Sequence, residues 1–462
     1  MSSLNTRRGR VAALAILLAT TAWPLHAETL NEALATAYAT NPGLDAQRAA
    51  LRSTDELVPQ ALSGWRPTVQ VVGRAGYEQS DSNRLVARQN LHPRSVSLEA
   101  TQPLFRGFRT LNGTSQAENT VRAARAQLAS AEQSVLLDTV AAYMDVIRDQ
   151  AVLELNTSNL EVLRRQLEAS NDRFRVGEIT RTDVAQSEAA VSGALSSRTQ
   201  AEALLTSSRA AYQRVVGRLP EKLDPPPALP ALPATEEEAR SIALSENPDL
   251  AATRMAELAA ADSVKVAKGA LLPSAAFVGT LTKAEQTSLE NDEAESGSVI
   301  AQVQVPLYQS GAEYSQIRQA QELHSQRRVE IAAAERQVIE GVTNAWEQLR
   351  TARAVIDSSR EQVRANEIAV EGVRQEAAVG SRTTLDVLDA EQTLLNSRVS
   401  LVRAQRDEYV AGFQLLAAVG RLNAAGLKLE TPVYDPEANY EDVRGQWIGY
   451  KSDETGTESV LP

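Results

Sequence analysis

The chain has 462 residues, a formal net charge of -12 and no cysteine. Its acidic balance argues against general nucleic-acid binding, because such a surface needs positive charge to displace counterions. Disulfides, thiol nucleophiles and cysteine-ligated metal sites are excluded, and three scattered histidines are too few for a histidine-rich metal site. We therefore expect no cofactor, no resident metal and no nucleic-acid partner.

The N-terminus, residues 1–27, is typical of a secretory signal peptide. Three arginines within residues 7–10 precede an apolar run over residues 11–22, and residues 25–27 offer a cleavage site before Glu28. The run is too short to span a bilayer, and no later stretch is apolar for long enough to form a transmembrane helix. We expect an exported mature chain that could enter a membrane only through β-strands.

An internal repeat organises the chain. Asn41-Pro42 recurs as Asn247-Pro248, 206 residues later, and Val176-Gly177 recurs as Val379-Gly380, 203 residues later. Further pairs keep the same order: Pro67 with Pro273, Pro103-Leu104-Phe105 with Pro306-Leu307-Tyr308, and Gly217-Arg218-Leu219 with Gly420-Arg421-Leu422. The sequence therefore predicts two colinear structural repeats that differ in the length of one loop.

The repeats are expected to span residues 28–218 and 235–425, each with a leading helix, two strands and a long helical hairpin. Between them, residues 219–234 contain six prolines, which predicts a stiff, extended linker that we interpret as a spacer. Residues 426–462 form a polar tail. From residue 431 onwards we interpret this tail as a mobile appendage.

Proline placement and heptad spacing predict the helices. No proline lies between Pro103 and Pro220 or between Pro306 and Pro432. Within these windows apolar residues recur every seven positions: Val146, Leu153, Leu160, Leu167 and Phe174, then Leu349, Ile356, Val363, Val370 and Ala377. Such spacing is typical of long supercoiled helices, the first from about Thr114 to Val176, although an ordinary soluble coiled coil has the same pattern.

Four segments ahead of the long helices alternate between apolar and polar residues, as strands with one apolar face do. Their apolar sets are Val69, Val71, Gly73, Ala75 and Tyr77; Val96, Leu98 and Ala100; Ala275, Phe277, Gly279 and Leu281; and Val299, Ala301, Val303 and Val305. Residues 81–94 and 285–297 are predicted polar connectors. Alternation alone does not distinguish membrane strands from a soluble sheet packed on one side.

If these strands cross a membrane, the chain must associate with copies of itself. Small membrane barrels begin at about eight strands, and an open sheet edge would leave backbone groups unpaired in lipid. Two or more chains would therefore share one barrel, and the heptad faces of the helices need neighbours as well. These arguments do not choose between a dimer and a trimer.

Several motifs resemble the TolC family of outer-membrane efflux and secretion channels. Residues 378–390 are similar to the periplasmic tip of these channels, and residues 173–177 with 182–184 are similar to its counterpart in the first half. Pro103-Leu104-Phe105 followed by Gly107, and the early Asn41-Pro42, are also typical of the family. The resemblance covers nearly all of the mature chain and keeps the order of its parts.

The resemblance implies a mainly α-helical fold with a membrane β-barrel. Three chains would build a twelve-stranded barrel in the outer membrane and an α-helical barrel in the periplasm. The expected function is an exit duct, not an enzyme, that works with a periplasmic adaptor protein and an inner-membrane ABC or proton-driven transporter. The resemblance favours type I protein secretion, and multidrug efflux is the alternative within the family.

The resemblance also implies an acidic gate. Asp386 and Asp389 match acidic residues that ring the periplasmic entrance, where three subunits would place six carboxylates around one axis. Such rings favour cations, and crowding of like charges raises carboxylate pKa values. Asp386 follows Thr383 by three residues, so a purely helix-capping role is the alternative interpretation.

A latch between hairpins is implied as well. Arg382 matches a family arginine that joins the inner and outer hairpins, with Thr182 and Asp183 as its partners in the other hairpin. The family often has a tyrosine where this chain has Ala377, so the latch is expected to be incomplete. Gly177 and Gly380 are predicted hairpin turns, which the resemblance places where an adaptor docks.

Two other classes of protein compete with this interpretation. A soluble periplasmic coiled-coil adaptor or scaffold would explain the heptads, but it needs one hairpin and a compact β-domain rather than a large duplication. A hydrolase is the weaker alternative, because the sequence contains no G-x-S-x-G motif, no triad-capable histidine and no metal-ligand cluster.

Overall fold

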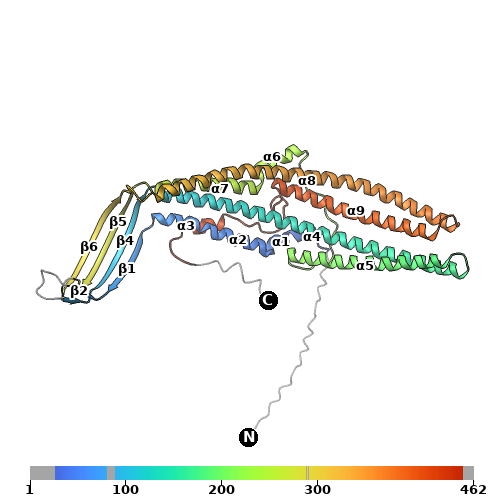
Figure 1. The fold of residues 1–462 in the computed structure, drawn as a ribbon, viewed down its shortest axis with the longest axis horizontal. Coiled ribbons are helices and arrows are strands. Elements are labelled where there is room, and N and C mark those ends of the chain that lie inside the picture. The colour runs from blue at the N-terminus through green and yellow to red at the C-terminus, as the bar shows by residue number, and fades with distance from the viewer. Residues whose placement is uncertain (1–26, 81–88, 288, 290, 451–462) are drawn as a thin grey trace, which may run out of the picture.

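The computed structural model describes residues 27–80, 89–287, 289 and 291–450. The molecule is long and mainly helical, with a sheet at one end and the ends of two helical hairpins at the other (Figure 1). The predicted signal peptide lies almost entirely outside the described residues. None of the helices within the described ranges is both long and apolar enough to cross a membrane.

The first half begins with short helices that lead into the sheet. The elements are α1 (Leu30–Thr40), α2 (Pro42–Asp55), α3 (Leu57–Leu62), the 3₁₀ turn η1 (Ser63–Trp65), β1 (Thr68–Ala75), β2 (Glu78–Ser80), β3 (Gln89–Leu91), β4 (Arg94–Arg106), α4 (Arg109–Arg175) and α5 (Arg181–Val216).

The second half repeats this order. Its elements are α6 (Glu236–Glu246), α7 (Pro248–Gly269), β5 (Ser274–Glu285), β6 (Glu293–Gln304), α8 (Ala312–Ala378) and α9 (Thr384–Val419), followed by the short α10 (Ala438–Arg444).

The lengths of the helices confirm the repeat. α4 and α8 each contain 67 residues, and α5 and α9 each contain 36. At 1.5 Å per residue, each of the two longest helices extends for about 100 Å. The heptad residues Leu160 and Ile356 are buried, whereas Phe174, at the end of its series, is exposed.

The four predicted strands form one antiparallel sheet in the order β1-β4-β5-β6. The register brings the predicted apolar sets to a single face, since Val71 lies opposite Leu98 and Leu98 lies opposite Leu281. Gly279 in turn lies opposite Val299 on the last strand. Most of the large apolar side chains on this face are exposed in the single chain, and β1 and β6 are edge strands of the sheet.

The connectors are shorter than the sequence predicted. The second one ends where β6 begins at Glu293, inside the predicted range of 285–297. In the first, β3 occupies part of the predicted range of 81–94, and residues 81–88 lie outside the described part of the chain.

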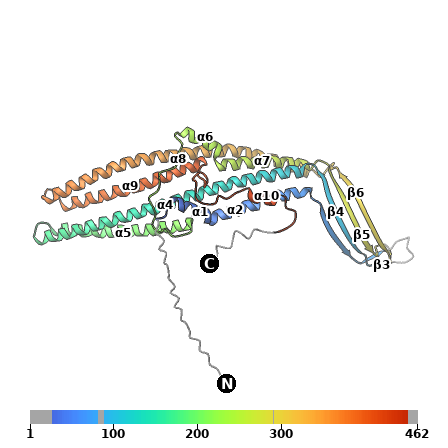
Figure 2. The ribbon, with the colours of Figure 1, turned by 180° about the vertical axis from the view of Figure 1, so that it is seen from behind.

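The repeated Asn-Pro motif joins helices end to end. The Asn41 side-chain oxygen caps α2 by accepting from the backbone N–H of Gly43, and the side-chain nitrogen donates to the last-turn carbonyl of Val215 in α5 (3.0 Å). Asn247 donates in the same way to the carbonyl of Ala418 in α9 (3.1 Å). As a result, α7 continues the line of α9 (Figure 2).

The main core lies where α1 packs against α4 and α5, the helices of the first hairpin, and against α9 of the second hairpin. Glu28 is buried at its edge, where its carboxylate accepts from the Tyr212 hydroxyl (2.7 Å) and from Arg218 (2.8 Å). Linker residues Leu223 and Leu229 pack against the same core. The linker is therefore part of the packed structure and not only the spacer that we predicted.

The C-terminal segment packs as well. Beyond the core, α10 contacts α2 and α3, and Asn439 donates to the buried carboxylate of Asp55 (2.7 Å). The mobile-appendage prediction is therefore wrong for residues 431–450, because polar side chains spaced along this segment find partners on the helices. Residues 451–462 lie outside the described part of the chain.

Candidate functional site: the hairpin tips

Each hairpin ends in a glycine turn at the helical end of the molecule (Figure 1). We call residues 173–187 the first hairpin tip and residues 376–390 the second hairpin tip. Gly177 has φ +81° and Gly380 has φ +80°, in the left-handed region that residues with a Cβ rarely adopt. A Cβ at either glycine would meet no atom within 4 Å, so the requirement for glycine comes from the backbone alone.

The same hydrogen bonds close both turns. In the first hairpin tip, the N–H groups of Gly177 and Glu178 donate to the carbonyls of Phe174 and Arg173, each at 2.9 Å. In the second, Gly380 donates to Ala377 (3.2 Å) and Ser381 donates to Glu376 (2.9 Å). These are Schellman motifs, which satisfy the last free carbonyls of a helix. Ala377 thus contributes a carbonyl to the turn and has no side chain that could join a latch.

A capping box then starts the returning helix in each hairpin tip. The Thr180 hydroxyl accepts from the Asp183 N–H (3.3 Å), and the Asp183 carboxylate accepts from the Thr180 N–H (2.9 Å). Thr383 and Asp386 make the same pair of bonds, at 3.2 and 2.9 Å. Asp386 therefore caps α9, so its carboxylate has a structural role whether or not it also forms part of a gate.

The capping bonds fix the charge of both aspartates. The Thr383 backbone N–H, its hydroxyl and the nearby Arg382 charge together hold the pKa of Asp386 below its ordinary value of 3.8. Hydrogen bonds from the hydroxyl and backbone of Thr180 lower the pKa of Asp183 in the same way. In the single chain these carboxylates are thus held ionised, whereas the expected crowding in an assembled ring would act in the opposite direction.

Asp389 lies one turn further along α9 and differs from Asp386. Its side chain is exposed and makes no hydrogen bond or ion pair to any described residue, while its backbone carbonyl accepts from the Thr393 hydroxyl (2.8 Å). The adjacent Leu388 is buried against Leu160 and Ala194 of the first hairpin. Asp389 is therefore a carboxylate held on a packed turn, available to a ligand.

Arg382 contacts its own turn rather than the other hairpin. Its Nε donates to Glu376 (2.8 Å), and this bond raises the pKa of the guanidinium. Among the described contacts of this single chain, none joins Arg382 to Thr182 or Asp183, since Asp183 is engaged in its own cap. The structure of one chain does not bring the latch residues together, so the latch stays a prediction for the assembled protein.

A partly exposed ion pair behind the second hairpin tip was missed by sequence reasoning. Arg374 of α8 pairs with the buried carboxylate of Glu391 in α9. A cavity of about 320 Å³ adjoins this pair, lined also by Gln166 of the first hairpin and by Val387. Arg374 lies four residues before the end of α8, whereas Glu391 lies seven residues after the start of α9. Their distances from the turn are unequal, so spacing alone did not identify the pair.

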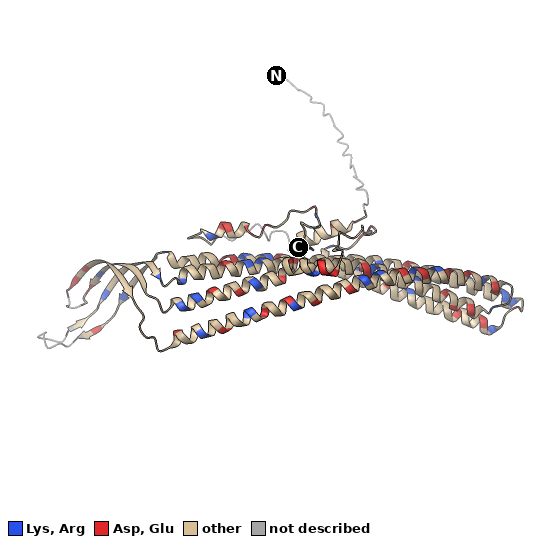
Figure 3. Cartoon of the chain, turned by 90° about the horizontal axis from the view of Figure 1, so that it is seen from above, with Lys and Arg blue, Asp and Glu red and all other residues tan. Residues whose placement is uncertain are grey.

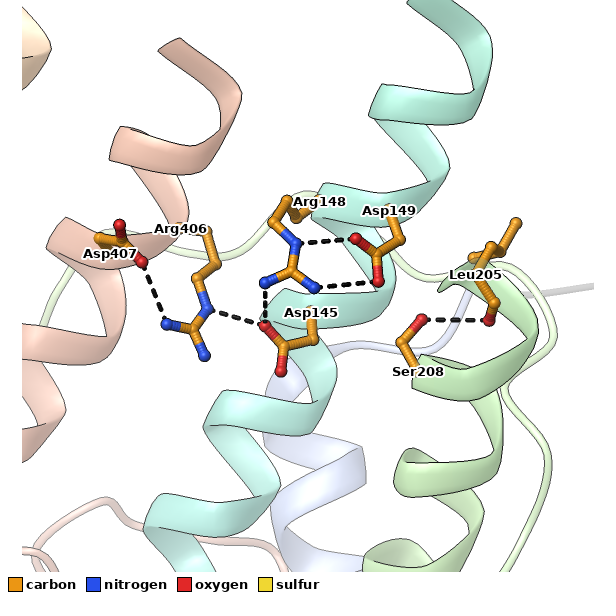
Figure 4. A network of polar contacts seen from close by, with 7 residues as sticks. All are labelled: Asp145, Arg148, Asp149, Leu205, Ser208, Arg406 and Asp407. Carbon is orange, nitrogen blue, oxygen red and sulfur yellow. Dashed lines mark hydrogen bonds and ion pairs between the residues drawn. The ribbon is translucent and has the colours of Figure 1, made fainter. Parts of the chain in front are cut away.

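A second polar network joins the two hairpins nearer the middle of the molecule (Figure 4). Asp145 of α4 accepts from Arg406 of α9 (2.8 Å) and from Arg148 of its own helix (2.8 Å). Arg148 also pairs with Asp149, and this hydrogen bond raises the pKa of the guanidinium. Charges of both signs are interspersed along the helices (Figure 3), and this network fixes one hairpin beside the other.

Charged side chains, rather than metal-ligand clusters, characterise the hairpin tips. Within the described residues, no group of three or more histidine, aspartate or glutamate side chains could hold a metal ion. The hairpin tips instead offer rigid turns with exposed carboxylates, which suit cation binding or contact with another protein.

Comparison with known proteins identifies relatives along nearly the whole chain. The model of a family described as outer membrane efflux protein matches residues 33–218 and 239–421. The outer membrane efflux protein BepC of Brucella suis is 36% identical over 92% of each chain. TolC of Vibrio cholerae is 28% identical, covering 87% of this chain and 94% of its own.

A relative with a narrower name is also similar. The alkaline protease secretion protein AprF of Pseudomonas aeruginosa is 28% identical over 72% of this chain and 71% of its own. Among solved structures, the CmeC outer membrane channel of Campylobacter jejuni matches with a TM-score of 0.77, covering 96% of this chain and 98% of that one. At 14% identity, this likeness supports the fold alone.

Proposed function

Because this chain belongs to the outer membrane efflux protein family, we propose that it is one subunit of a trimeric exit duct. The protein is an outer-membrane channel protein of the TolC type. The duct would carry cargo from an inner-membrane transporter across the periplasm and the outer membrane. The observation that carries this proposal is the sheet, which has one apolar face and two open edges.

The dimensions of the sheet fit a bilayer. β5 and β6 each contain 12 residues, so at about 3.4 Å per residue and a tilt of roughly 45° they would span about 30 Å. The apolar face is exposed in the single chain, as a lipid-facing surface is. Three copies of the four strands would pair β6 of one subunit with β1 of the next and close a twelve-stranded barrel.

The same symmetry would turn the helices into a tunnel. The two hairpins of each subunit extend for about 100 Å from the sheet, in the direction expected for the periplasm. Three subunits would bring the second hairpin tips together, with Asp386 and Asp389 forming a ring of six carboxylates. A ring of this kind selects cations and binds multivalent ones. Arg382 would then reach Thr182 and Asp183 of the first hairpin tip only in the assembled duct.

The partners would be a periplasmic adaptor, docked at the turns of Gly177 and Gly380, and an inner-membrane ABC or proton-driven transporter. We favour type I protein secretion, in line with the overall resemblance and with the secretion protein AprF among the relatives. Multidrug efflux is the second candidate, supported by the efflux protein BepC. A deletion strain would separate them, since loss of a secreted protein from the medium and increased drug sensitivity are different phenotypes.

Conductance of the purified mature protein in a planar bilayer tests the proposal. We expect discrete, cation-preferring steps that a trivalent cation blocks from one side only. Failure to insert, with a chain that stays monodisperse without detergent, would contradict the duct and support a soluble coiled-coil scaffold. Insertion without block would retain the duct and remove the acidic gate.

A further inference from the structure

The end of the described C-terminal segment is unusually apolar for its position. Trp447, Ile448 and Tyr450 lie within four residues of one another and are 65%, 92% and 101% exposed. Within the part of the chain that the structure describes, no residue covers Ile448 or Tyr450. An exposed apolar cluster of this kind, outside the sheet, indicates a binding surface.

Specific contacts hold this segment in place. Arg444 of α10 pairs with Glu118 of α4 (3.1 Å), and Glu437, just before α10, pairs with Arg125 (2.6 Å). The centre of the Tyr440 ring lies 5.0 Å from the guanidinium of Arg125 and 5.7 Å from that of Arg444. The apolar cluster is therefore presented from a fixed support.

The support places the cluster at the base of the sheet. Arg66, two residues before β1, donates to the backbone carbonyl of Gln446 (2.7 Å), and its guanidinium lies 5.0 Å from the centre of the Trp447 ring. A groove of about 520 Å³ lies between this segment and α3, with Arg66 in its lining. The groove thus combines aromatic, aliphatic and cationic side chains.

Other exposed apolar residues lie at the same position along the long axis of the molecule, at the base of the sheet. They lie at the junctions between strands and helices: Trp65, Phe108, Leu307 and Tyr308. Tryptophan and tyrosine concentrate where a membrane meets water, because their rings are apolar and their polar atoms stay hydrated. Arginine beside them is suited to lipid phosphate.

We propose that residues 446–450 form a membrane-surface anchor that inserts Trp447, Ile448 and Tyr450 among the lipid headgroups at the base of the barrel. This inference rests on the proposed function, because it requires the sheet to cross the bilayer. The segment would add lipid contact outside the barrel and fix the height of the helices below the membrane. The ligand of the groove between this segment and α3 is phospholipid, with the phosphate facing Arg66.

Single-tryptophan variants test this anchor. Without the signal peptide the chain contains Trp65, Trp346 and Trp447, and replacing two of the three with Phe leaves one reporter each. The full-length mature protein is reconstituted in vesicles whose lipids carry bromine near the headgroup end of the acyl chains. We expect Trp447 fluorescence to fall by about half and Trp65 to be quenched as well. Trp346, which packs among α6, α8 and α9, should be unaffected.

The outcomes separate the two proposals. Quenching of Trp65 without quenching of Trp447 would overturn the anchor and leave the membrane sheet intact, with a neighbouring subunit as the occupant. Absence of quenching at both positions would overturn the membrane sheet itself.

A matched pair of variants checks the result without disturbing the core. Ile448→Glu should reduce Trp447 quenching at least twofold and leave Trp65 quenching unchanged. Val433→Glu, at an exposed position earlier in the same segment, should change neither. Equal quenching in all three proteins would overturn insertion of the cluster.

Discussion

The two hairpin tips share their turn and their helix cap but differ at other side chains. Both use a glycine turn and a Thr-Asp capping box with almost the same geometry. Where the second hairpin tip has Asp389 and Arg382, the first has Gln186 and Ile179 at the matching positions, 203 residues earlier. Features present in both tips are explained by the need to turn a hairpin, so features confined to one tip are the candidates for function.

This comparison ranks the two candidate gate residues. Asp386 has an equivalent in Asp183, and both cap a helix, so its presence needs no gate to explain it. Asp389 has no acidic equivalent and no side-chain partner among the described residues. We therefore assign the larger share of any cation binding to Asp389, with Asp386 adding charge from a fixed position.

The largest expected difference between the tips is in cation block. Replacing Asp386 and Asp389 with alanine removes six carboxylates from the proposed ring, so block of the channel by a trivalent cation should weaken roughly a hundredfold. The matched change at Asp183 and Gln186 should alter block little. Titration of single-channel current measures both, and equal weakening in the two double variants would refute a gate confined to the second tip.

Asp389→Asn alone sharpens this test. It removes charge without touching a cap, so it should account for most of the lost affinity while trimer assembly is unchanged. If Asp386→Asn has the larger effect, our ranking of the two residues is wrong. Native mass spectrometry of each variant verifies that assembly is intact.

The glycine turns should respond equally, because the constraint at both is the backbone. Gly177→Ala and Gly380→Ala each place a Cβ in the left-handed region, at a cost of about 1–2 kcal/mol in local stability. Amide hydrogen exchange around each turn measures this cost. A much larger loss at one turn would mean that another subunit packs against it in the assembled protein.

The capping threonines are expected to have a smaller effect. Thr180→Ala and Thr383→Ala each remove the hydroxyl that accepts from the helix, which destabilises the first turn by about 1 kcal/mol. Exchange of the N–H groups of Asp183 and Asp386 reports the change directly. Serine at either position should restore protection, and failure of serine to do so would indicate that the threonine methyl group matters instead.

Local periodicity explains what the sequence predicted well. The apolar sets of the strands, including Val71 and Leu281, meet on one face because alternation and strand pairing have the same period of two. Heptad positions such as Leu160 and Ile356 are buried because a repeat of seven residues keeps one side of a supercoiled helix facing its neighbour. Both patterns recur in each half, so the architecture could be predicted from the sequence of one chain.

Contacts between distant single residues follow no period and were missed. Asp145 and Arg406 pair across 261 residues, and Asn439 reaches Asp55 across 384. A polar segment such as residues 431–450 therefore resembles an unstructured tail in sequence although its side chains have specific partners. Latch contacts between subunits have the same character, so neither the sequence nor one chain can place them.

The smallest expected effect is the response of the caps to pH, which should be the same at both tips. Asp183 and Asp386 have pKa values lowered from 3.8, so each carboxylate stabilises its cap fully above that pH. This contribution is lost only as the pH falls through the lowered pKa, below 3.8. For the unassembled chain, amide exchange corrected for its intrinsic pH dependence should therefore show both caps unchanged from pH 7 to pH 5. In the assembled duct, crowding would raise the pKa of Asp386 but not that of Asp183. Loosening of the second cap alone at pH 5 would then reveal the ring through its electrostatics.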